Sequence, residues 1–561
     1  MDINTLVFRE GIDMKSCSVV CHLAVDRDSE NRAFVSYWSA ATICDDPCVV
    51  EGQSLNDLFK FIDCGKVSSI YFHDFDFEST YIINWLFMNG YVCTDNRQVN
   101  KKFSMLRDSD NNLYFIKVCN GTSKVEIRGS RNKLRSSVKD IALGFLNTNT
   151  NIVDYCLQGT IDKNMYYDYV ICVALALNEM FNDGLKKLTT SGDARQQWKN
   201  TLDVSYDKLF PILSHNVNKY LRNGYKGGFV WCKDAIVDQQ VGKGIVFDYN
   251  SMYSSMMRFC PLPYGEPHYF TGDPADELQG MGSKYYCGRA YVTAHIKEDH
   301  IPCICCATDS IDIGSVVKND VMEDINGELL YLTNFDELLL NEQYDVDAID
   351  WLDGYWFNIR EGMFDKYIDK WHGKKSTSIG GKRAVSKLML ESLYGGFGIK
   401  DNKRWVVPEI VNGIVRYKED ESKKKNKEAY LPVAMFTTAM ARAEVILTAQ
   451  KYYDRLIYID TDSMHLLGDT LPDGLDIDPV KLGCWKIEST FVDGKYLRQK
   501  TYMHLHDDGT YVIKMSGAPD IVKNQIVSWD DFRVGAKFTG KAVMIKLVGG
   551  AWRKYSTYSI L

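Results

Sequence analysis

Long hydrophobic runs, low-complexity tracts and fixed-period repeats are missing from this chain of 561 residues, and its 12 prolines are thinly spread. The longest apolar stretch, residues 170–177, is much shorter than the roughly 20 residues of a membrane-spanning helix. The first residues, MDINTLVFRE, contain neither the basic nor the apolar segment of a secretory signal. With a 45% share of hydrophobic residues, these absences exclude collagen-like, disordered and membrane-embedded chains. We expect a soluble, cytoplasmic protein without a membrane partner.

A strong excess of charge is also absent, because 66 lysines and arginines face 74 aspartates and glutamates, for a net charge of −8. Nucleic-acid binding needs only a local basic surface, so this balance does not exclude a polyanionic partner. The 16 cysteines are expected to be reduced thiols, since no export signal is found. Two pairs, Cys17/Cys21 and Cys44/Cys48, are spaced more widely than the usual zinc-binding pairs, and we predict no zinc site.

The first part of the chain mixes short strand patterns with helix patterns, which is typical of an α/β domain. A buried strand is predicted at 68–72, a helix at 79–88 and a buried helix at 168–182. A polar stretch at 189–197 predicts a domain boundary. At about 150 residues per domain, the length predicts three to four domains.

One carboxylate follows a short apolar strand pattern. Asp248 comes directly after 245–247 and precedes a helix-like segment. A carboxylate fixed at the end of a strand can hold a hard cation. A single aspartate of this kind is more often a cap or turn residue, so this residue needs support from others.

Two further carboxylates, Asp460 and Asp462, flank one threonine between two apolar strand patterns. Carboxylates this close repel each other strongly unless a cation lies between them. A loop that only needed to turn would not require both charges. The sequence therefore predicts a cation-binding hairpin here.

Cationic side chains recur along 375–394, which is predicted as one helix. Arg383, Lys387 and Glu391 follow at intervals of four, and Lys375 lies eight residues before Arg383, so all four are expected on one helical face. A stripe of three cations suits a triphosphate. An ordinary solvent-exposed face is the alternative.

Segment 495–502 is predicted as a strand from its aromatic and β-branched content, which places Lys500 and Tyr502 on one side. An ammonium group beside an aromatic ring suits the phosphate and sugar of a nucleic-acid strand, although an isolated pair of this kind is a weak signal. The charge run at 418–428 is typical of a solvated hairpin or loop.

The order of these four features resembles the family B DNA polymerases. The family's motifs A, B and C read here DYNSMY at 248–253, KLMLESLYG at 387–395 and YIDTDS at 458–463. The protein-primed subgroup of small tailed bacteriophages and linear plasmids is the closer match. Its marks are YKGG at 225–228, Thr438-x-x-Ala441-Arg442, and KLGCWKIESTFVDGKYLRQKTY at 481–502.

In that family the fold is a right hand of palm, fingers and thumb with an N-terminal ribonuclease H-like exonuclease domain, an α/β (α+β) multidomain architecture. The resemblance implies an exonuclease-like domain at 1–190, palm at 191–261 and 428–530, a first insertion at 262–360, fingers at 361–400, a second insertion at 401–427 and a thumb at 531–561. In relatives the first insertion contacts the priming protein and the second helps to encircle DNA. The lysines at 423–427 fall in the second insertion, which adds DNA contact to the interpretations of that charge run.

The resemblance also implies roles for individual residues. Asp248, Asp460 and Asp462 would be catalytic and, with the Tyr249 carbonyl, would hold two Mg²⁺ ions, for which Mn²⁺ is a substitute. The expected nucleotide-binding residues are Tyr253, which would exclude a 2′-hydroxyl, Lys375, Arg383, Lys387 and Tyr394. The expected DNA-binding residues are Tyr225, Gly227, Gly228, Thr438, Arg442, Lys500, Tyr502 and Ser130.

The implied function is template-directed DNA synthesis on a linear viral or plasmid genome, with protein-primed initiation and strand-displacing elongation. The implied partners are primer-template DNA, dNTPs and a terminal protein whose hydroxyl group primes synthesis. We expect a monomer or a heterodimer with the terminal protein, in the host cytoplasm if the protein is viral.

The exonuclease-like region departs from the family pattern. Segment 14–24 has no carboxylate where relatives carry an Asp-x-Glu motif. Asp74 and Glu78 replace the asparagine and aspartate of the second motif, and Asp168 lies one residue from the position of the third. A shift of one residue rotates a side chain by about 100° around a helix. We therefore expect weak or no 3′–5′ exonuclease activity, in a domain that still binds single strands through Ser130.

Two other functions remain open. One is a catalytically silent relative that acts as a DNA-binding replication scaffold; only Glu391, which replaces the usual asparagine of motif B, leaves this open. The other is a 3′–5′ nuclease with a vestigial polymerase half, which the opposite pattern of motif loss argues against.

Overall fold

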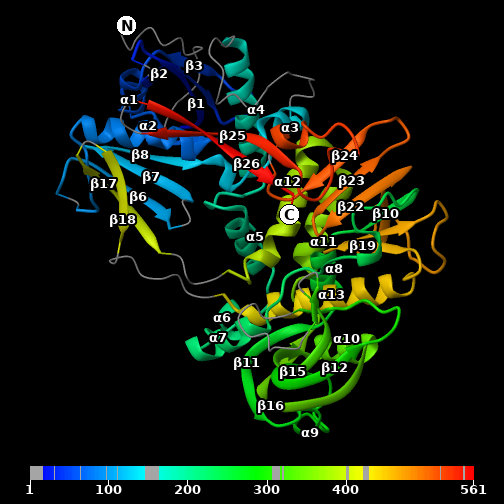
Figure 1. The fold of residues 1–561 in the computed structure, drawn as a ribbon. Coiled ribbons are helices and arrows are strands. Elements are labelled where there is room, and N and C mark those ends of the chain that lie inside the picture. The colour runs from blue at the N-terminus through cyan, green and yellow to red at the C-terminus, as the bar shows by residue number, and fades with distance from the viewer. Residues whose placement is uncertain are drawn as a thin grey trace.

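The computed structural model describes residues 17–30, 32–63, 65–96, 98–109, 112–145, 163–305, 316–318, 321–399, 404–412, 414–420, 429–518, 520–546 and 550–560. In this part of the chain the strands form five sheets. Figure 1 shows the N-terminal sheet and a six-stranded sheet at opposite ends of the molecule, with a central sheet and its helices between them.

The N-terminal sheet has ten strands in the order β18-β17-β6-β7-β8-β4-β1-β2-β3, with β5 paired to β6. Its N-terminal strands are β1 (Cys17–Arg27), β2 (Ala33–Thr42), β3 (Val49–Gly52), β4 (Val67–Phe72), β5 (Val92–Cys93), β6 (Lys101–Asp108), β7 (Leu113–Asn120) and β8 (Ser123–Gly129). The helices of this region are α1 (Leu55–Asp63), α2 (Phe75–Met88), α3 (Val138–Phe145) and α4 (Lys163–Asn182). The predicted strand at 68–72 and helices at 79–88 and 168–182 are confirmed, within β4, α2 and α4.

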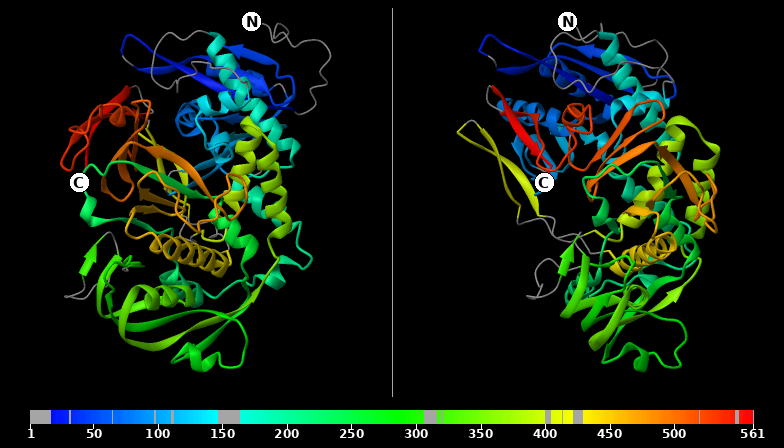
Figure 2. Two further views of the ribbon diagram at one scale, coloured as in Figure 1. Left: turned by 90° about the vertical axis from the view of Figure 1, so that its right-hand side faces the viewer. Right: turned by 45° about the vertical axis from the view of Figure 1, so that its right-hand side comes forward.

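Two strands of the N-terminal sheet come from much later in the chain. The hairpin of β17 (Trp405–Val411) and β18 (Ile414–Glu419) extends the sheet at β6, where Trp405 pairs with Asp108 and Val406 with Arg107. The Arg107 guanidinium lies 4.3 Å from the centre of the Tyr417 ring. Figures 1 and 2 show this hairpin, in yellow, beside the blue N-terminal strands. The lysines at 423–427 lie outside the described residues.

The central sheet has five strands in the order β21-β10-β20-β19-β9. They are β9 (Val230–Cys232), β10 (Gly244–Tyr249), β19 (Leu456–Asp460), β20 (Ser463–Leu467) and β21 (Trp485–Phe491), accompanied by α6 (Tyr206–Leu209), α7 (His215–Gly224), α8 (Met252–Phe259) and α13 (Leu431–Gln450). The strand at 245–247 followed by a helix is confirmed by β10 and α8, and the predicted hairpin around residue 461 by β19 and β20.

Helix α13 is the one helix in the described part of the chain that is long and apolar enough to cross a membrane. Its mean hydropathy over the most apolar window is 1.3, but 89% of that window is buried inside the protein. It packs against α8 and the central sheet. The helix is therefore a core element, and apolar residues cover all its faces for that reason.

The described residues between 262 and 360 form a six-stranded sheet in the order β11-β16-β12-β15-β13, with β14 paired to β15. Its elements are β11 (Leu262–Thr271), α9 (Pro274–Glu277), β12 (Tyr285–Ile296), β13 (Ile304–Cys305), β14 (Val316–Lys318), β15 (Val321–Thr333), α10 (Asn334–Gln343) and β16 (Tyr344–Arg360). This is the range in which the first insertion is expected from the sequence. Figure 2 shows it as a separate layer next to α13.

The single helix expected over 375–394 is wrong. The chain forms α11 (Asp365–Thr377) and α12 (Gly380–Gly395), which pack against each other as a helical hairpin. Ser378 and Ile379 are extended between the two helices, and Gly380, the first residue of α12, has a φ of 55°; a Cβ there would lie 2.6 Å from the carbonyl oxygen of Gly144. Only glycine fits such a close approach at this backbone angle.

The polar stretch at 189–197, expected as a domain boundary, forms a helix. Helix α5 (Thr190–Lys199) begins after Thr189, whose hydroxyl accepts a hydrogen bond from the Gly192 N–H at 3.1 Å. Asp193 is buried in it and forms an ion pair with the buried Lys133 of the N-terminal region. Helix α5 also packs against α12, so it ties the N-terminal region to the helical hairpin.

The strand expected over 495–502 is also wrong in part. Strand β22 (Asp493–Arg498) ends before a turn at Gln499 and Lys500, and β23 (Thr501–Leu505) runs back beside it. Lys500 has a φ of 54°, a turn conformation, and is not on a strand with Tyr502.

The C-terminal region is completed by β24 (Tyr511–Met515), α14 (Asp520–Lys523) and the hairpin of β25 (Lys537–Lys546) and β26 (Gly550–Ser559). Leu497, Met503, Phe532 and Ile560 share one apolar cluster, which spans the boundary expected at 530.

Candidate active site in the central sheet

Three carboxylates meet at one end of the central sheet. Asp248 lies near the end of β10, Asp460 ends β19, and Asp462 follows after one residue. The registers place both Asp248 and Asp460 opposite Ser463 of β20. The Tyr249 N–H donates to the Asp462 carbonyl oxygen at 2.7 Å, which holds the two strand ends together.

The turn between Asp460 and Asp462 is tight. Thr461 has a φ of 58°, and its N–H donates to the Phe229 carbonyl oxygen at 2.6 Å. A Cβ on Gly228 would lie 2.6 Å from the Thr461 side chain, so the turn requires glycine there. Gly228 thus supports the geometry of the carboxylate turn, in addition to the DNA contact that the sequence predicts for it.

Each of two carboxylates is paired with a lysine. Lys500 Nζ lies 2.6 Å from Asp460 Oδ1, although Lys500 sits in a turn and not in the expected strand. Lys486 forms an ion pair with Asp248. Sequence reasoning missed Lys486, and its signal is the register of β21 on β10, which places Lys486 directly opposite Asp248.

Asp462 is mostly buried. This burial, followed by the charges of Asp248 and Asp460, raises the pKa of Asp462 to about 7. A carboxyl group in this setting favours an added positive charge over further negative charge. The three carboxylates therefore favour binding of a further cation, even with Lys486 and Lys500 paired to Asp248 and Asp460.

The donor set fits a hard divalent cation. In the described part of the chain no three Asp, Glu, His or Cys side chains are already gathered at metal-binding distances. The raised pKa of Asp462 and the two lysine ammonium groups at its neighbours nevertheless mark a place where cationic charge is needed. Carboxylate and carbonyl oxygens are the ligands that Mg²⁺ prefers. Asp248, Asp460, Asp462 and the Tyr249 carbonyl are therefore the residues that fit it.

The cationic side chains of the helical hairpin converge on this site in spite of the helix break. Lys375, near the end of α11, donates from Nζ to Ser251 Oγ at 2.9 Å. Arg383 Nη1 of α12 donates to the Lys375 carbonyl oxygen at 3.1 Å. Burial, and then the charges of Lys486, Arg383 and Lys387, lower the pKa of Lys375. Several cations thus share one small region, which suits a polyanionic ligand.

Glu391, the departure in motif B, lies one turn after Lys387. Its Oε1 is 3.6 Å from Lys387 Nζ, and both side chains are exposed. Glu391 also contributes to the field at Lys375, where it acts against the neighbouring cations. The residue therefore moderates the positive charge of the hairpin and does not fill a buried position.

Three tyrosines connect the helices around the carboxylates. The rings of Tyr253 on α8 and Tyr394 on α12 are 4.4 Å apart, and the Tyr394 hydroxyl is 2.6 Å from that of Tyr225. Burial raises the pKa of Tyr253 to about 12. The predicted nucleotide residues Tyr253 and Tyr394 are thus brought together with the predicted DNA residue Tyr225.

Thr438 and Arg442, for which DNA contacts are predicted, are both buried on α13 in this structure without DNA, and their contact with DNA stays a prediction. Thr438 Oγ1 donates to the Lys226 carbonyl oxygen at 2.7 Å. Arg442 donates to the Lys226 and Gly227 carbonyl oxygens at 3.1 and 3.2 Å and pairs with the buried Asp336 at 2.9 Å. These residues therefore position the loop that carries Tyr225, Gly227 and Gly228.

Tyr502 lies beneath the Asp460 turn. Its ring is 5.3 Å from that of Tyr458 and 5.1 Å from that of His465. The Tyr458 hydroxyl accepts the Lys500 N–H at 2.7 Å, so this aromatic layer fixes the turn that carries Lys500. Lys500 and Tyr502 remain close, but through a hairpin instead of one strand.

The exonuclease candidates are bound to other protein groups. Glu78 is completely buried, with His22 Nδ1 at 3.0 Å and the Leu23 N–H at 3.2 Å. Asp74 pairs with Arg131 at 2.8 Å. His22 was not foreseen as a partner; it lies on β1, the strand without carboxylates.

Two more positions in the N-terminal region differ from their expected roles. Asp168 lies on α4, and burial raises its pKa. Ser130 is completely buried, with its hydroxyl 2.9 Å from His73 Nδ1, and its contact with single-stranded DNA stays a prediction. His73 Nε2 lies 3.0 Å from the Ser136 carbonyl oxygen, so both ring nitrogens are occupied.

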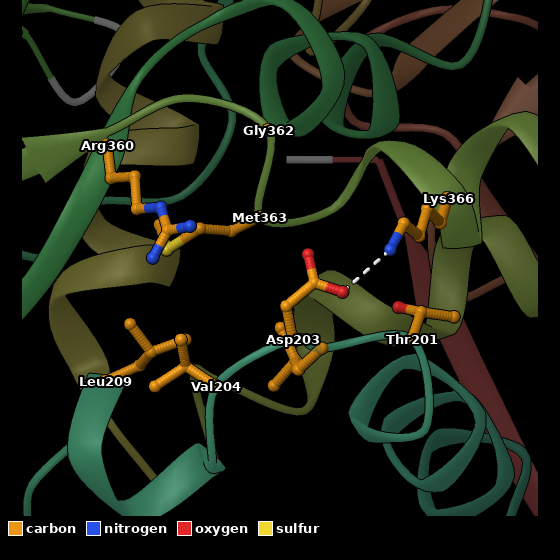
Figure 3. Close-up of a pocket in the computed structure, with 9 residues that line it drawn as sticks. Thr201, Asp203, Val204, Leu209, Arg360, Gly362, Met363 and Lys366 are labelled. Carbon is orange, nitrogen blue, oxygen red and sulfur yellow. Dashed lines mark hydrogen bonds and ion pairs between the residues drawn. The ribbon is translucent and has the colours of Figure 1, made fainter.

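The cavity in Figure 3 is separate from these sites. It has a volume of about 30 Å³, and none of the three central carboxylates lines it. Asp203 and Lys366 form an ion pair at 2.8 Å across it, and Thr201, Val204 and Leu209 complete much of its wall. This volume holds little more than a water molecule. Because the side chains of Asp203 and Lys366 are largely exposed, the cavity is a small pocket at the protein surface.

This chain is similar to known proteins both in sequence and in structure. Residues 153–473 match the family described as DNA polymerase type B, organellar and viral. The DNA polymerase of Bacillus phage B103 is 33% identical over 544 residues, covering 91% of this chain and 93% of that protein. The DNA polymerase of Bacillus phage phi29 is 32% identical over 551 residues with the same coverage. The solved structure of phi29 DNA polymerase with primer-template DNA has a TM-score of 0.85 at 30% identity, covering 97% of this chain and 100% of that one. Its complex with primer-template DNA and incoming nucleotides has the same TM-score and coverage.

Proposed function

The chain belongs to the type B DNA polymerases of organelles and viruses, and on that premise we propose that it copies a linear genome by protein-primed initiation and strand-displacing elongation. Its activity is that of a DNA-directed DNA polymerase. The observation that carries the proposal is the meeting of Asp248, Asp460 and Asp462 at one end of the central sheet, below the cations of α11 and α12.

Divalent metal ions are general cofactors of this family. Asp248, Asp460, Asp462 and the Tyr249 carbonyl would hold two Mg²⁺ or Mn²⁺ ions. When bound, such ions supply the positive charge that activates the attacking hydroxyl and stabilises the leaving pyrophosphate. The need for positive charge around Asp462 supports this assignment.

The remaining residues of the site bind and orient the substrates. Lys375, Arg383 and Lys387 neutralise the triphosphate. Lys375 is half-buried, so charge pairing is stronger there than in water, whereas Arg383 and Lys387 are exposed. Tyr253 packs under the sugar and excludes a 2′-hydroxyl, while Tyr394 lies against the nascent base pair. The contact between their rings at 4.4 Å supports a shared wall for the nucleotide.

The DNA primer end is held by Lys500 and Tyr502. The solved phi29 polymerase complexes contain primer-template DNA and incoming nucleotides, which supports DNA and dNTPs as ligands of this chain. Lys500 contacts Asp460 directly, so a primer phosphate bound there would lie beside the carboxylates. Tyr225, Gly227 and Gly228 form the facing loop, which Thr438 and Arg442 hold from below.

The β11–β16 sheet at 262–360 is the proposed contact for the terminal protein, whose hydroxyl would replace the primer end in the first transfer. The β17–β18 hairpin is the proposed element of strand displacement. Its pairing with β6 supports a fixed position beside the N-terminal sheet. The N-terminal region itself is proposed to have weak or no 3′–5′ exonuclease activity, since Glu78 and Asp74 are engaged by His22 and Arg131.

The test is primer extension on a longer template with Mg²⁺, with and without dNTPs. The wild-type enzyme is expected to extend the primer, Asp460→Ala is expected not to extend it, and the surface variant Asp469→Ala is expected to extend it normally. An intact primer in the reaction without dNTPs supports the missing exonuclease activity. Binding of DNA by the wild type without extension would favour the replication scaffold, and shortening of the primer would show an active exonuclease.

Protein priming has its own readout. The enzyme, a labelled dNTP and the terminal protein are expected to give a labelled protein that resists nuclease and is lost with Asp460→Ala. Normal primer extension without any labelled protein would restrict the enzyme to nucleic-acid primers.

A further inference from the structure

Lys486 is a cation inside the proposed metal site. It lies on β21 directly opposite Asp248 of β10, and facing residues on neighbouring antiparallel strands point to the same side of the sheet. The two side chains form an ion pair and are 33% and 21% exposed. The pairing is therefore dictated by the register of two strands that are 238 residues apart in sequence.

The surroundings of Lys486 are those of the substrate site and not of the protein surface. Its charge acts on Asp462, the carboxyl whose neighbours are Asp248 and Asp460. The Lys486 charge also acts on Lys375, the residue that contacts Ser251 and belongs to the cationic group of α11 and α12. Lys486 thus lies between the carboxylates on one side and the triphosphate-binding cations on the other.

We propose that Lys486 is a built-in counter-ion that occupies Asp248 in the metal-free enzyme, competes there with the divalent cation, and is released toward the triphosphate when that cation binds. The inference rests on the proposed function, because it takes Asp248 as a metal-binding residue. Lys486 is a positioning residue for Asp248 before substrate binding and a ligand of the triphosphate afterwards.

Two opposite consequences follow from the competition. Removing the ammonium group frees Asp248, so the divalent cation binds more tightly. It also removes one cation from the triphosphate side, so the nucleotide binds less tightly. A general packing defect would weaken the binding of both the divalent cation and the nucleotide. Tighter binding of the cation together with weaker binding of the nucleotide therefore separates the proposal from a structural role.

The experiment measures Mn²⁺ binding to the full-length protein without DNA or nucleotide, by the electron paramagnetic resonance signal of free Mn²⁺. Lys486→Met is expected to lower the Mn²⁺ Kd by about tenfold, as the loss of one partly buried competing charge. Lys486→Arg, which keeps the charge, and Lys481→Met, which removes an exposed lysine from the preceding loop, are expected to bind as the wild type does. In primer extension, Lys486→Met is expected to raise the KM for dNTP and to lower the half-saturating Mg²⁺ concentration.

Equal Mn²⁺ Kd values for Lys486→Met and the wild type, with binding lost in Asp248→Asn, would overturn the inference and leave the proposed function intact. Tighter binding in Lys481→Met to the same extent would also overturn it, since the effect would then be one of net charge. Mn²⁺ binding that Asp248→Asn does not change would remove Asp248 from the metal site, and the proposed function would fall with the inference.

Discussion

Two groups of carboxylates in this molecule are paired with basic groups: one lies at the strand ends of the central sheet, and the other lies in and just before helix α2 of the N-terminal region. In the central sheet the partners are Lys486 and Lys500, whose side chains are 33% and 46% exposed. In the N-terminal region Glu78 of α2 is paired with His22 of β1, and these side chains are 0% and 4% exposed. A solvent-accessible ammonium group can be exchanged for a metal ion or a phosphate, whereas a buried imidazole cannot leave. Carboxylates paired with basic groups are therefore suited to catalysis in the central sheet and to stabilising the fold in the N-terminal region.

The largest expected effect tests the central side of this comparison. Asp462→Asn keeps the shape of the side chain but removes the charge that divalent cations require, so the rate of primer extension should fall at least about a thousandfold. The rate is measured by single-turnover extension, with circular dichroism as a check of folding. Retention of more than a tenth of the activity would contradict a chemical role for this carboxylate.

The N-terminal side is tested by Glu78→Ala. The change leaves His22 Nδ1 and the Leu23 N–H without their buried acceptor, which should lower the free energy of unfolding by about 3 kcal/mol. Urea denaturation followed by tryptophan fluorescence measures this loss, and Glu30→Ala, an exposed residue of the same region, is the control. We expect no change in trimming of a mismatched 3′ end. Loss of a trimming activity in this variant would show that Glu78 is catalytic after all.

A buried histidine makes the N-terminal region sensitive to acid. Burial, and then the charge of Arg131, lower the pKa of His73 from 6.5 to about 4. The unfolded chain therefore takes up a proton below pH 6.5 that the folded protein does not, and stability is lost as the pH falls from 6.5 toward 4. Between pH 7 and pH 5 this amounts to about 2 kcal/mol.

His73→Gln should remove that part of the pH dependence, as measured by urea denaturation at both pH values. The exposed His215→Gln serves as the matched variant and should keep it. An unchanged pH dependence in His73→Gln would mean that the acid sensitivity arises elsewhere.

The smallest effect concerns the exposed pair of Lys387 and Glu391. Exposed ion pairs contribute about 0.2–1 kcal/mol. Glu391→Gln frees Lys387 for the triphosphate, so the KM for dNTP should fall about two- to threefold with kcat unchanged. Steady-state kinetics at saturating primer-template measure this. A fall in kcat to a few per cent would instead give Glu391 a part in the chemistry.

Much of the central site could be predicted from the sequence. The motifs of Asp248, Asp460 and Asp462 are local patterns in which strands and turns follow from a few neighbouring residues. Lys486 has no such pattern, because its partner is set by a strand register that only the folded sheet defines. The close approach of Gly380 to the backbone of Gly144 depends in the same way on the folded chain, although the Gly380-Gly381 pair is a local signal for a helix break.

The burial of Thr438 and Arg442 teaches a related lesson. Polar side chains in motifs are expected to contact ligands, yet these two lie on α13, whose residues are apolar on all faces and buried. In such a helix, polar groups must find partners within the protein, and the carbonyl oxygens of Lys226 and Gly227 are the partners here. The apolar composition of the surrounding helix is the sequence signal for the burial of these two side chains, and their contact with DNA stays a prediction.

The pairing of β17 with β6 has a consequence for the evolution of the chain. A polymerase truncated before residue 190 would leave β17 with an open edge, which is a template for intermolecular strand pairing and aggregation. The N-terminal sheet therefore covers the edge of a strand that the chain contributes some three hundred residues later, a role that does not depend on the carboxylates Asp74 and Glu78.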